Sequence, residues 1–200
     1  MGRSGMPNRQ MAQDSQMIMK TYIKQNKSNS MISNKEIFRS IIQRSQDKNQ
    51  GATVIVPHVC NNLDLFGGGF AAQVAAEYPE VKSNYHLLGK KFLQSNLGHD
   101  QFIIVHKEPV YGHKIIFVNM IAQNGIRRPD NERPLNYAAL VRSMVGVSQY
   151  IQMNTGFITK QEKIEIHAPR FGSGLAGGHW DFIDDLITDI WYRYPVYIYS

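Results

Sequence analysis

Short apolar segments rich in β-branched residues alternate with helical patterns along this chain, and the alternation limits the folds open to it. The segment Ala-Thr-Val-Ile-Val at residues 52–56 suits a strand that is buried on both faces of a sheet. Strands are expected at residues 17–24, 52–56, 102–105, 114–120, 163–167 and 196–199, and helices at residues 33–45, 70–78, 135–153 and 179–192. This order predicts an α/β protein with a three-layer α/β/α architecture.

The first of these helices is expected to begin at a capping box. Ser33 and Glu36 have the spacing at which two side chains satisfy free backbone N–H groups at a helix start. Apolar residues then recur at helical spacing, beginning with Ile37 and Phe38. Pro79 is expected to end the second helix, since proline does not continue one.

The length of 200 residues indicates one domain. Residues 1–15 show no hydrophobic period and are expected to form a flexible tail, so the domain is expected to span residues 16–200. No segment approaches the roughly 18 consecutive apolar residues of a membrane-spanning helix. Cys60 is the only cysteine, which excludes an internal disulfide and a cysteine-based zinc site. A reducing, cytoplasmic setting fits this sequence best.

The positive charge of the chain lies in its N-terminal quarter. Residues 1–50 carry nine lysines and arginines against three acidic residues, whereas residues 51–200 carry thirteen of each sign. A basic terminus can bind nucleic acid or an acidic surface. The simpler interpretation, which we favour, is a solvated segment that keeps the protein soluble.

A glycine-rich segment lies between the strand expected at residues 52–56 and the helix expected at residues 70–78. Gly67, Gly68 and Gly69 are consecutive. Glycines let backbone N–H groups converge on an anion, and the next helix adds the positive end of its dipole. A tight turn between strand and helix is the alternative, but it rarely needs three glycines. The segment therefore favours a phosphate-binding loop.

A second glycine-rich segment has the same setting, between the strand expected at residues 163–167 and the helix expected at residues 179–192. It runs from Pro169 to Trp180 and contains four glycines. Arg170 is either a phosphate partner or a surface ion-pair residue, and Trp180 either stacks on a ligand or packs within the protein. Two anion-binding loops in one small domain point to a diphosphate held from both sides.

A Rossmann dinucleotide site fits the first loop poorly. Eight residues, from Asn61 to Gly68, lie between the expected strand and the end of the glycine pattern. In a dinucleotide-binding fold the glycine-rich turn follows the strand directly. No acidic residue ends a strand about twenty positions further on. The Rossmann interpretation would also leave the second loop without a role.

Catalytic and metal-binding residues give weaker signals. The seven histidines lack the spacing of a metal site, and we expect neither a metal nor another cofactor. His58 is a candidate acid or base, because it follows a buried strand beside the first loop; a buried histidine with a structural role is the alternative. Cys60 and Ser173 have no evident activating partner, so we expect neither to be a nucleophile.

Three segments, in order along the chain, resemble the macrodomain family, whose members bind ADP-ribose. The segments Val-Pro-His-Val-Cys-Asn at residues 56–61 and Phe-Gly-Gly-Gly-Phe at residues 66–70 are similar to the family's first loop, particularly in its microbial Appr-1-p processing branch. Residues 118–126 and 134–140 resemble the middle of that branch, and residues 168–180 resemble the family's second phosphate loop. The resemblance covers most of residues 16–200 and implies a macrodomain fold with a mixed central sheet.

The resemblance also implies a role for each loop. The first loop would border the distal ribose, with Asn61 near it, and the second would surround the diphosphate. Asn26 would contact the adenine, because its amide oxygen can accept a hydrogen bond from the adenine amino group. The implied ligand-binding residues are Asn26, Asn61, Phe66, Gly67, Gly68, Gly69, Phe70, Asn119, Gln123, Arg170, Phe171, Gly172, Ser173, Gly174, Leu175, Ala176 and Gly177.

Two departures from the family bear on catalysis. Gln123 and Ala176 stand where a branch that removes ADP-ribose from glutamate has a lysine and an aspartate. Hydrolysis at the distal ribose, of a 1″-phosphate or an ADP-ribosyl bond, would use a water positioned by the ligand phosphate and Asn61, with His58 assisting. His58 and Asn61 are therefore the catalytic candidates.

Two further interpretations stay open. A non-catalytic reader of ADP-ribose is supported by the missing lysine and aspartate. A nucleic-acid-binding module, using the basic residues before position 50, is the third hypothesis. The expected partner is ADP-ribose or an ADP-ribosylated substrate, and no membrane partner is expected.

Overall fold

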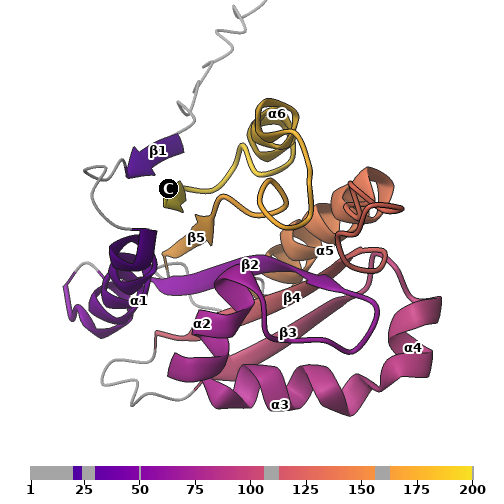
Figure 1. Cartoon of the computed structure of the whole chain (residues 1–200). Coiled ribbons are helices and arrows are strands. Elements are labelled where there is room, and N and C mark those ends of the chain that lie inside the picture. The colour runs from indigo at the N-terminus through magenta and orange to yellow at the C-terminus, as the bar shows by residue number, and fades with distance from the viewer. Residues whose placement is uncertain (1–19, 24–29, 50, 106–112, 156–162, 200) are drawn as a thin grey trace, which may run out of the picture.

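The computed structural model describes residues 20–23, 30–49, 51–105, 113–155 and 163–199 (Figure 1). The predicted tail at residues 1–15 and the predicted adenine contact Asn26 lie outside the described residues. The elements are β1 (Lys20–Ile23), α1 (Ser30–Gln46), β2 (Thr53–Asn61), α2 (Gly69–Glu77), α3 (Pro79–Leu88), α4 (Lys90–Ser95), β3 (Asp100–Val105), β4 (Ile115–Gln123), α5 (Tyr137–Thr155), β5 (Ile164–Pro169), α6 (Trp180–Ile190) and β6 (Val196–Tyr199). Within these ranges, no helix is long and apolar enough to cross a membrane.

The described strands form one mixed sheet with the order β1-β6-β5-β2-β4-β3. Its neighbouring strands are parallel, except that β3 pairs antiparallel with β4. The β-branched segments thus form strands where the sequence predicted them, because both faces of the sheet are covered and favour continuous apolar runs.

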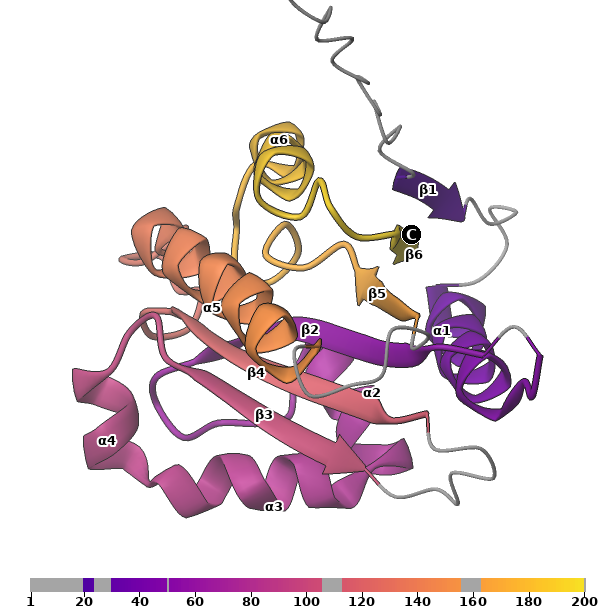
Figure 2. The ribbon, with the colours of Figure 1, turned by 180° about the vertical axis from the view of Figure 1, so that it is seen from behind.

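Helices cover both faces of this sheet and make the predicted three layers. Figures 1 and 2 show α5 and α6 on one face, with α1, α2 and α3 on the other. Two separate apolar clusters match this division, because Ile55 belongs to one cluster and its immediate neighbours on β2, Val54 and Val56, belong to the other. The predicted α/β/α architecture is therefore confirmed.

Strands β2 and β5 pair only over their first residues. The register joins Thr53 to Ile164 and ends where Ile55 meets Ile166. Both strands continue for several residues beyond this point, β2 beside β4 and β5 beside β6. The two strands therefore separate toward their carboxyl ends, which is where ligands bind in open α/β sheets.

The strand expected to end at residue 56 in fact runs on to Asn61, past Pro57. The backbone N–H of Thr53 donates toward β5 and that of Val54 donates toward β4, so the backbone N–H groups of odd-numbered residues of β2 point toward β5. Pro57, which has no N–H, therefore faces the side on which the β2–β5 ladder has already ended. Proline is tolerated here because no ladder hydrogen bond is lost.

Of two expectations about helix ends, the capping box is wrong, and the helix end at Pro79 is confirmed but incomplete. Helix α1 begins at Ser30, so Ser33 lies inside its first turns and is not the N-cap. Pro79 does more than end α2, because it is the first residue of α3, a position where its missing N–H costs nothing. The chain consequently has two helices, α3 and α4, that were not predicted, separated by Gly89 at φ 74°.

Helix α1 is attached to the sheet through a buried carboxylate. Arg44 donates from Nε and Nη2 to the two oxygens of Glu165 on β5, at 2.8 and 2.5 Å. His167 lies 3.1 Å from the same carboxylate through Nε2 and 2.7 Å from Tyr199 Oη through Nδ1. Burial alone would raise the pKa of Glu165, but the hydrogen bonds from His167 and Arg44 outweigh it and lower the pKa to about 2.

Candidate ligand-binding cavity

A cavity of about 660 Å³ lies where β2 and β5 separate, and both glycine-rich loops line it. The first loop follows β2 and leads into α2, and the second follows β5 and leads into α6. The two loops also contact each other, since Leu175 Cδ1 lies 3.1 Å from the position that a Cβ at Gly68 would take. Two loops that are over a hundred residues apart in sequence therefore line one cavity.

Most of the residues expected from the sequence surround this cavity. Its lining contains His58, Asn61, Phe66, Gly67, Gly68, Gly69, Phe70, Gln123, Arg170, Phe171, Gly172, Gly174, Leu175 and Ala176. Gln123 and Ala176, the two departures from the family pattern, both lie at the cavity wall. Ala176 is buried there, and its carbonyl oxygen accepts the N–H of Leu135.

Three of the expected ligand contacts do not line the cavity. Asn119 is fully buried in β4, where its Nδ2 donates to Gln101 Oε1 at 3.0 Å. Ser173 donates from Oγ to the carbonyl oxygen of Arg170, and this bond stabilises the turn of the second loop. Gly177 donates its N–H to the carbonyl oxygen of Gly174 and closes the next turn.

The glycines of the two loops meet different demands. A Cβ at Gly177, which has a φ of 69°, would lie 2.5 Å from the carbonyl oxygen of Glu132, so the fold itself requires glycine there. A Cβ at Gly67 or Gly174 would meet no atom within 4 Å, and neither residue has a positive φ. The protein's own packing therefore does not explain glycine at positions 67 and 174, both of which face the cavity.

Backbone N–H groups are free on both walls. Among the described residues, none accepts a hydrogen bond from the N–H groups of residues 66–68, Gly172 or residues 174–176. Helix α2 begins next to the first group, at Gly69, with Gly68 as an N-cap that offers no side-chain acceptor. Free N–H groups and a helix N-terminus together favour an anionic ligand.

His58 lies at the cavity wall but is 2% exposed. Phe66 and Phe70 pack edge-on against its ring, each with 5.7 Å between ring centroids. Burial lowers the pKa of His58 to about 4, although a hydrogen bond with Asn119 opposes this effect, so the ring is neutral at pH 7. Its Nε2 has no hydrogen-bond partner in the described part of the chain.

Cys60 also lies at the wall, next to His58. Its Sγ is 3.7 Å from Nδ1 of that histidine and 3.7 Å from Asn119 Oδ1. Burial raises the pKa of the Cys60 thiol well above its ordinary value. The thiol therefore stays protonated and is a poor nucleophile.

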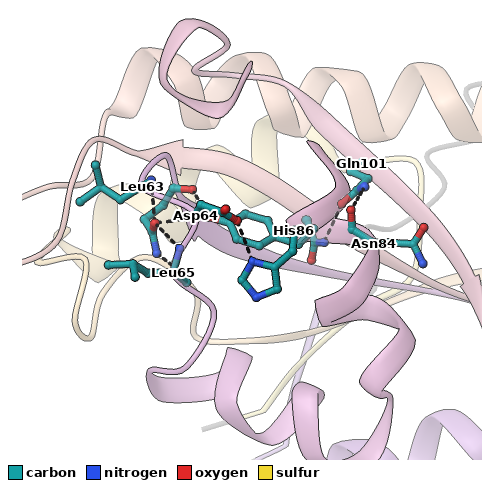
Figure 3. Close-up of polar contacts among 9 residues, drawn as sticks. Leu63, Asp64, Leu65, Asn84, His86 and Gln101 are labelled. Carbon is teal, nitrogen blue, oxygen red and sulfur yellow. Dashed lines mark hydrogen bonds and ion pairs between the residues drawn. The ribbon is translucent and has the colours of Figure 1, made fainter. Parts of the chain in front are cut away.

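Asn61 organises the first loop through its side chain. Its Oδ1 accepts the N–H of Leu63 at 2.8 Å and that of Leu65 at 3.4 Å, while Nδ2 donates to the carbonyl oxygen of Leu65 (Figure 3). Tyr85 on α3 donates from Oη to the backbone carbonyl oxygen of Asn61 at 2.7 Å. Both ends of the Asn61 amide are thus engaged with the loop.

The structure adds charged residues to the cavity that were not predicted. Asp64 in the first loop and His86 on α3 face each other, with 2.7 Å between Oδ1 and Nδ1 (Figure 3). Lys82, one turn before His86, and Arg127 line the same cavity. In the sequence, Lys82 and His86 are four residues apart, which places them on one face of a helix. This spacing predicts a shared face only once residues 79–88 are known to be helical.

The second loop carries one further cation. Arg170 lies over the ring of Trp180, with its Cζ 4.6 Å from the ring centroid, which is a cation–π contact within the protein. With Lys82 and Arg127, Arg170 gives the cavity three basic side chains. Asp64 is the only acidic residue among the described residues of the lining. No cluster of three or more potential metal ligands occurs in the described ranges.

Solved structures with the same architecture provide the comparison. The chain is similar to a protein of unknown function from Bacteroides thetaiotaomicron, with 24% identity, a TM-score of 0.62, and coverage of 74% of this chain and 88% of that one. A macrodomain protein from Streptomyces coelicolor is 25% identical, with a TM-score of 0.58 and coverage of 78% and 94%. Thermosipho africanus DarTG in complex with ADP-ribose is 15% identical, with a TM-score of 0.54 and coverage of 74% and 39%. No family model and no curated protein matches the sequence.

Proposed function

The chain has the macrodomain fold, and on this premise we propose that the cavity between its two glycine-rich loops binds ADP-ribose or a molecule that carries an ADP-ribosyl group. One observation carries the proposal. Gly67 and Gly174 line the cavity from different loops, a side chain at either position would meet open space, and the protein's own packing gives no reason for glycine at either position. A diphosphate held between these loops supplies that reason.

The size and polarity of the cavity support the same ligand. A volume of about 660 Å³ lies in the range of small-molecule and cofactor sites. The free N–H groups on both walls suit phosphate oxygens, and Lys82, Arg127 and Arg170 complement their charge. The ADP-ribose in the Thermosipho africanus DarTG structure supports ADP-ribose as the first ligand to test.

The binding test is a ligand panel measured by thermal shift and then by calorimetry. We expect ADP-ribose to stabilise the protein, and AMP to do so less because it lacks the second phosphate and the distal ribose. Gly68→Glu and Gly174→Glu should abolish binding, because a carboxylate would occupy the position of the diphosphate. Leu87→Glu adds the same charge at an exposed position on α3 away from the cavity and should bind normally. Unchanged affinity in both glycine variants would refute the proposed site.

Hydrolysis of a bond at the distal ribose is the finer part of the proposal. A 1″-phosphate or an ADP-ribosyl bond is the candidate substrate. Gln123 and Ala176 at the cavity wall support the alternative, a reader that binds without turnover. Release of phosphate from ADP-ribose 1″-phosphate, or of ADP-ribose from an ADP-ribosyl carboxylate ester, by the purified protein separates the two functions.

The basic N-terminal fifty residues support the nucleic-acid hypothesis only through their charge. Much of this segment lies outside the described residues. A salt titration of oligonucleotide binding tests the hypothesis, because phosphate contacts give a steep fall in affinity with salt.

A further inference from the structure

Asp64 and His86 are brought together at the cavity by different elements. His86 projects from α3, and Asp64 belongs to the first loop, twenty-two residues earlier. Figure 3 shows the two side chains joined by one hydrogen bond. Both residues line the cavity, yet the proposed binding of a diphosphate by the loops gives them no task.

The hydrogen bond fixes which nitrogen of His86 can accept a proton. An ionised carboxylate only accepts hydrogen bonds, so Nδ1 of His86 carries the hydrogen that Asp64 Oδ1 accepts. In the neutral ring Nε2 is then the basic nitrogen. Nε2 has no hydrogen-bond partner among the described residues, and the His86 side chain is 38% exposed. The pair thus has the arrangement in which a carboxylate orients a histidine base.

The backbone at Asp64 is held in an uncommon conformation. Asp64 has a φ of 63°, and it is the only residue other than glycine with a positive φ in the described ranges. The side chain of Asn61 clamps both of its neighbours, Leu63 and Leu65, and Tyr85 anchors Asn61. Strained residues that the surroundings hold in this way cluster at functional sites.

The groups around the pair suit a substrate with an anionic leaving group. Lys82 lies one helical turn from His86 on α3, and the ring of Tyr85 packs edge-on against the His86 ring. Arg127 follows a turn that Asn62 holds by accepting the N–H of Gly125. A charged wall of this kind suits ribose hydroxyls and an anion, whereas an adenine base needs apolar surfaces.

We propose that Asp64 and His86 are the proton-transfer pair of this cavity, and that they activate water for attack on a distal ribose linked to a carboxylate or phosphate oxygen. The inference rests on the proposed ADP-ribose site. The water oxygen bonds to C1″ while the bond from C1″ to the leaving oxygen breaks. One water proton passes to Nε2 of His86, and the leaving group departs as an anion that needs no proton and lies beside Lys82 and Arg127. Asp64 stays ionised and stabilises the imidazolium.

His58 is the competing base, and the structure separates it from His86. His58 is 2% exposed between two phenylalanine rings, and no carboxylate in the described part of the chain pairs with it. His86 is accessible and oriented. In this arrangement Asn61 is a positioning residue, because its side chain holds the loop that carries Asp64.

The test compares His86→Gln, Asp64→Asn and His58→Gln with the control Leu87→Gln, an 82% exposed neighbour on α3 outside the cavity lining. Calorimetry measures ADP-ribose affinity, and single-turnover assays measure cleavage of an ADP-ribosyl carboxylate ester and of ADP-ribose 1″-phosphate. We expect His86→Gln to lower the cleavage rate by about 10²-fold or more, as for loss of a general base, with affinity unchanged. Asp64→Asn should lower the cleavage rate in the same direction, because an amide no longer orients the His86 ring as the carboxylate does.

Each other outcome overturns the inference. The inference is wrong if His86→Gln and Asp64→Asn keep the wild-type turnover, or if only His58→Gln loses it. It is also wrong if the wild type binds ADP-ribose but turns over neither substrate. In water labelled with ¹⁸O, released phosphate that carries the label would show attack at phosphorus and would also refute the step. An absence of ADP-ribose binding would instead refute the proposed function itself.

Discussion

Two glycines of the second loop, four residues apart, should respond in opposite ways to the same small substitution. A Cβ at Gly178 would lie 2.4 Å from Leu135 Cδ2 and 2.7 Å from the carbonyl oxygen of Gly172. A Cβ at Gly174 would meet nothing within 4 Å. The stability of Gly178→Ala and Gly174→Ala therefore tests whether the loop is packed as described.

The expected magnitudes follow from these contacts. The Leu135 side chain can shift, but the Gly172 carbonyl belongs to a backbone that cannot move without disturbing the loop, so we expect Gly178→Ala to cost about 2–3 kcal/mol. In a protein of this size that loss corresponds to a fall in Tm of roughly 5–10 °C. Gly174→Ala should be neutral or should stabilise by up to about 1 kcal/mol, because alanine restricts the unfolded chain.

Urea denaturation of the two variants and the wild type measures the difference. Equal m-values would show that the variants unfold to the same extent as the wild type. Equal stability of Gly178→Ala and Gly174→Ala would refute the reasoning, because it would mean that the contacts around Gly178 relax at no cost. A strong loss of stability in Gly174→Ala would show that its side-chain position is not open.

Two buried groups predict how stability depends on pH. The pKa of Glu165 is lowered from 4.5 to about 2, so the ionised carboxylate stabilises the fold fully above pH 4.5, and this stabilisation is lost as the pH falls toward 2. We expect Glu165→Gln to remove this acid sensitivity, which amounts to at most about 3 kcal/mol in the free energy of unfolding. Urea midpoints measured between pH 5 and 3 test the expectation. The pKa of His58 is lowered from 6.5 to about 4, so the unfolded chain binds more protons between these values and the wild type loses stability as the pH falls through this range. His58→Gln should flatten the profile between pH 6.5 and 4, and an unchanged slope in either variant would contradict the corresponding assignment.

The strands were predictable because their signal is local. A β-branched segment covered on both sides is apolar at every position, and this pattern is visible without knowing its neighbours. The end of β2 was not predictable, because Pro57 and the polar residues after it resemble a loop. Only the pairing shows that β5 has left the ladder before Pro57, which makes the missing N–H harmless.

The charged part of the cavity depended on contacts that a linear pattern does not contain. From the sequence alone Pro79 predicts the end of a helix, and it gives no sign of the helix α3 that carries Lys82 and His86. Asp64 was visible within the first loop, but its partner lies on that missed helix. The contact between them exists because Tyr85 brings α3 against the loop at Asn61.

The glycine-rich loops show why the sequence located the cavity and yet did not resolve its residues. A run of glycines reads the same whether the fold or a ligand requires it, and the prediction therefore treated Gly174 and Gly177 alike. The structure separates them, because the carbonyl oxygen of Glu132 excludes a side chain at Gly177, whereas nothing in the protein does so at Gly174. A glycine kept without a packing demand, on a wall of free N–H groups, is best explained by the atoms of a ligand that come close to it. The case for a diphosphate thus depends on the few glycines that the fold does not need.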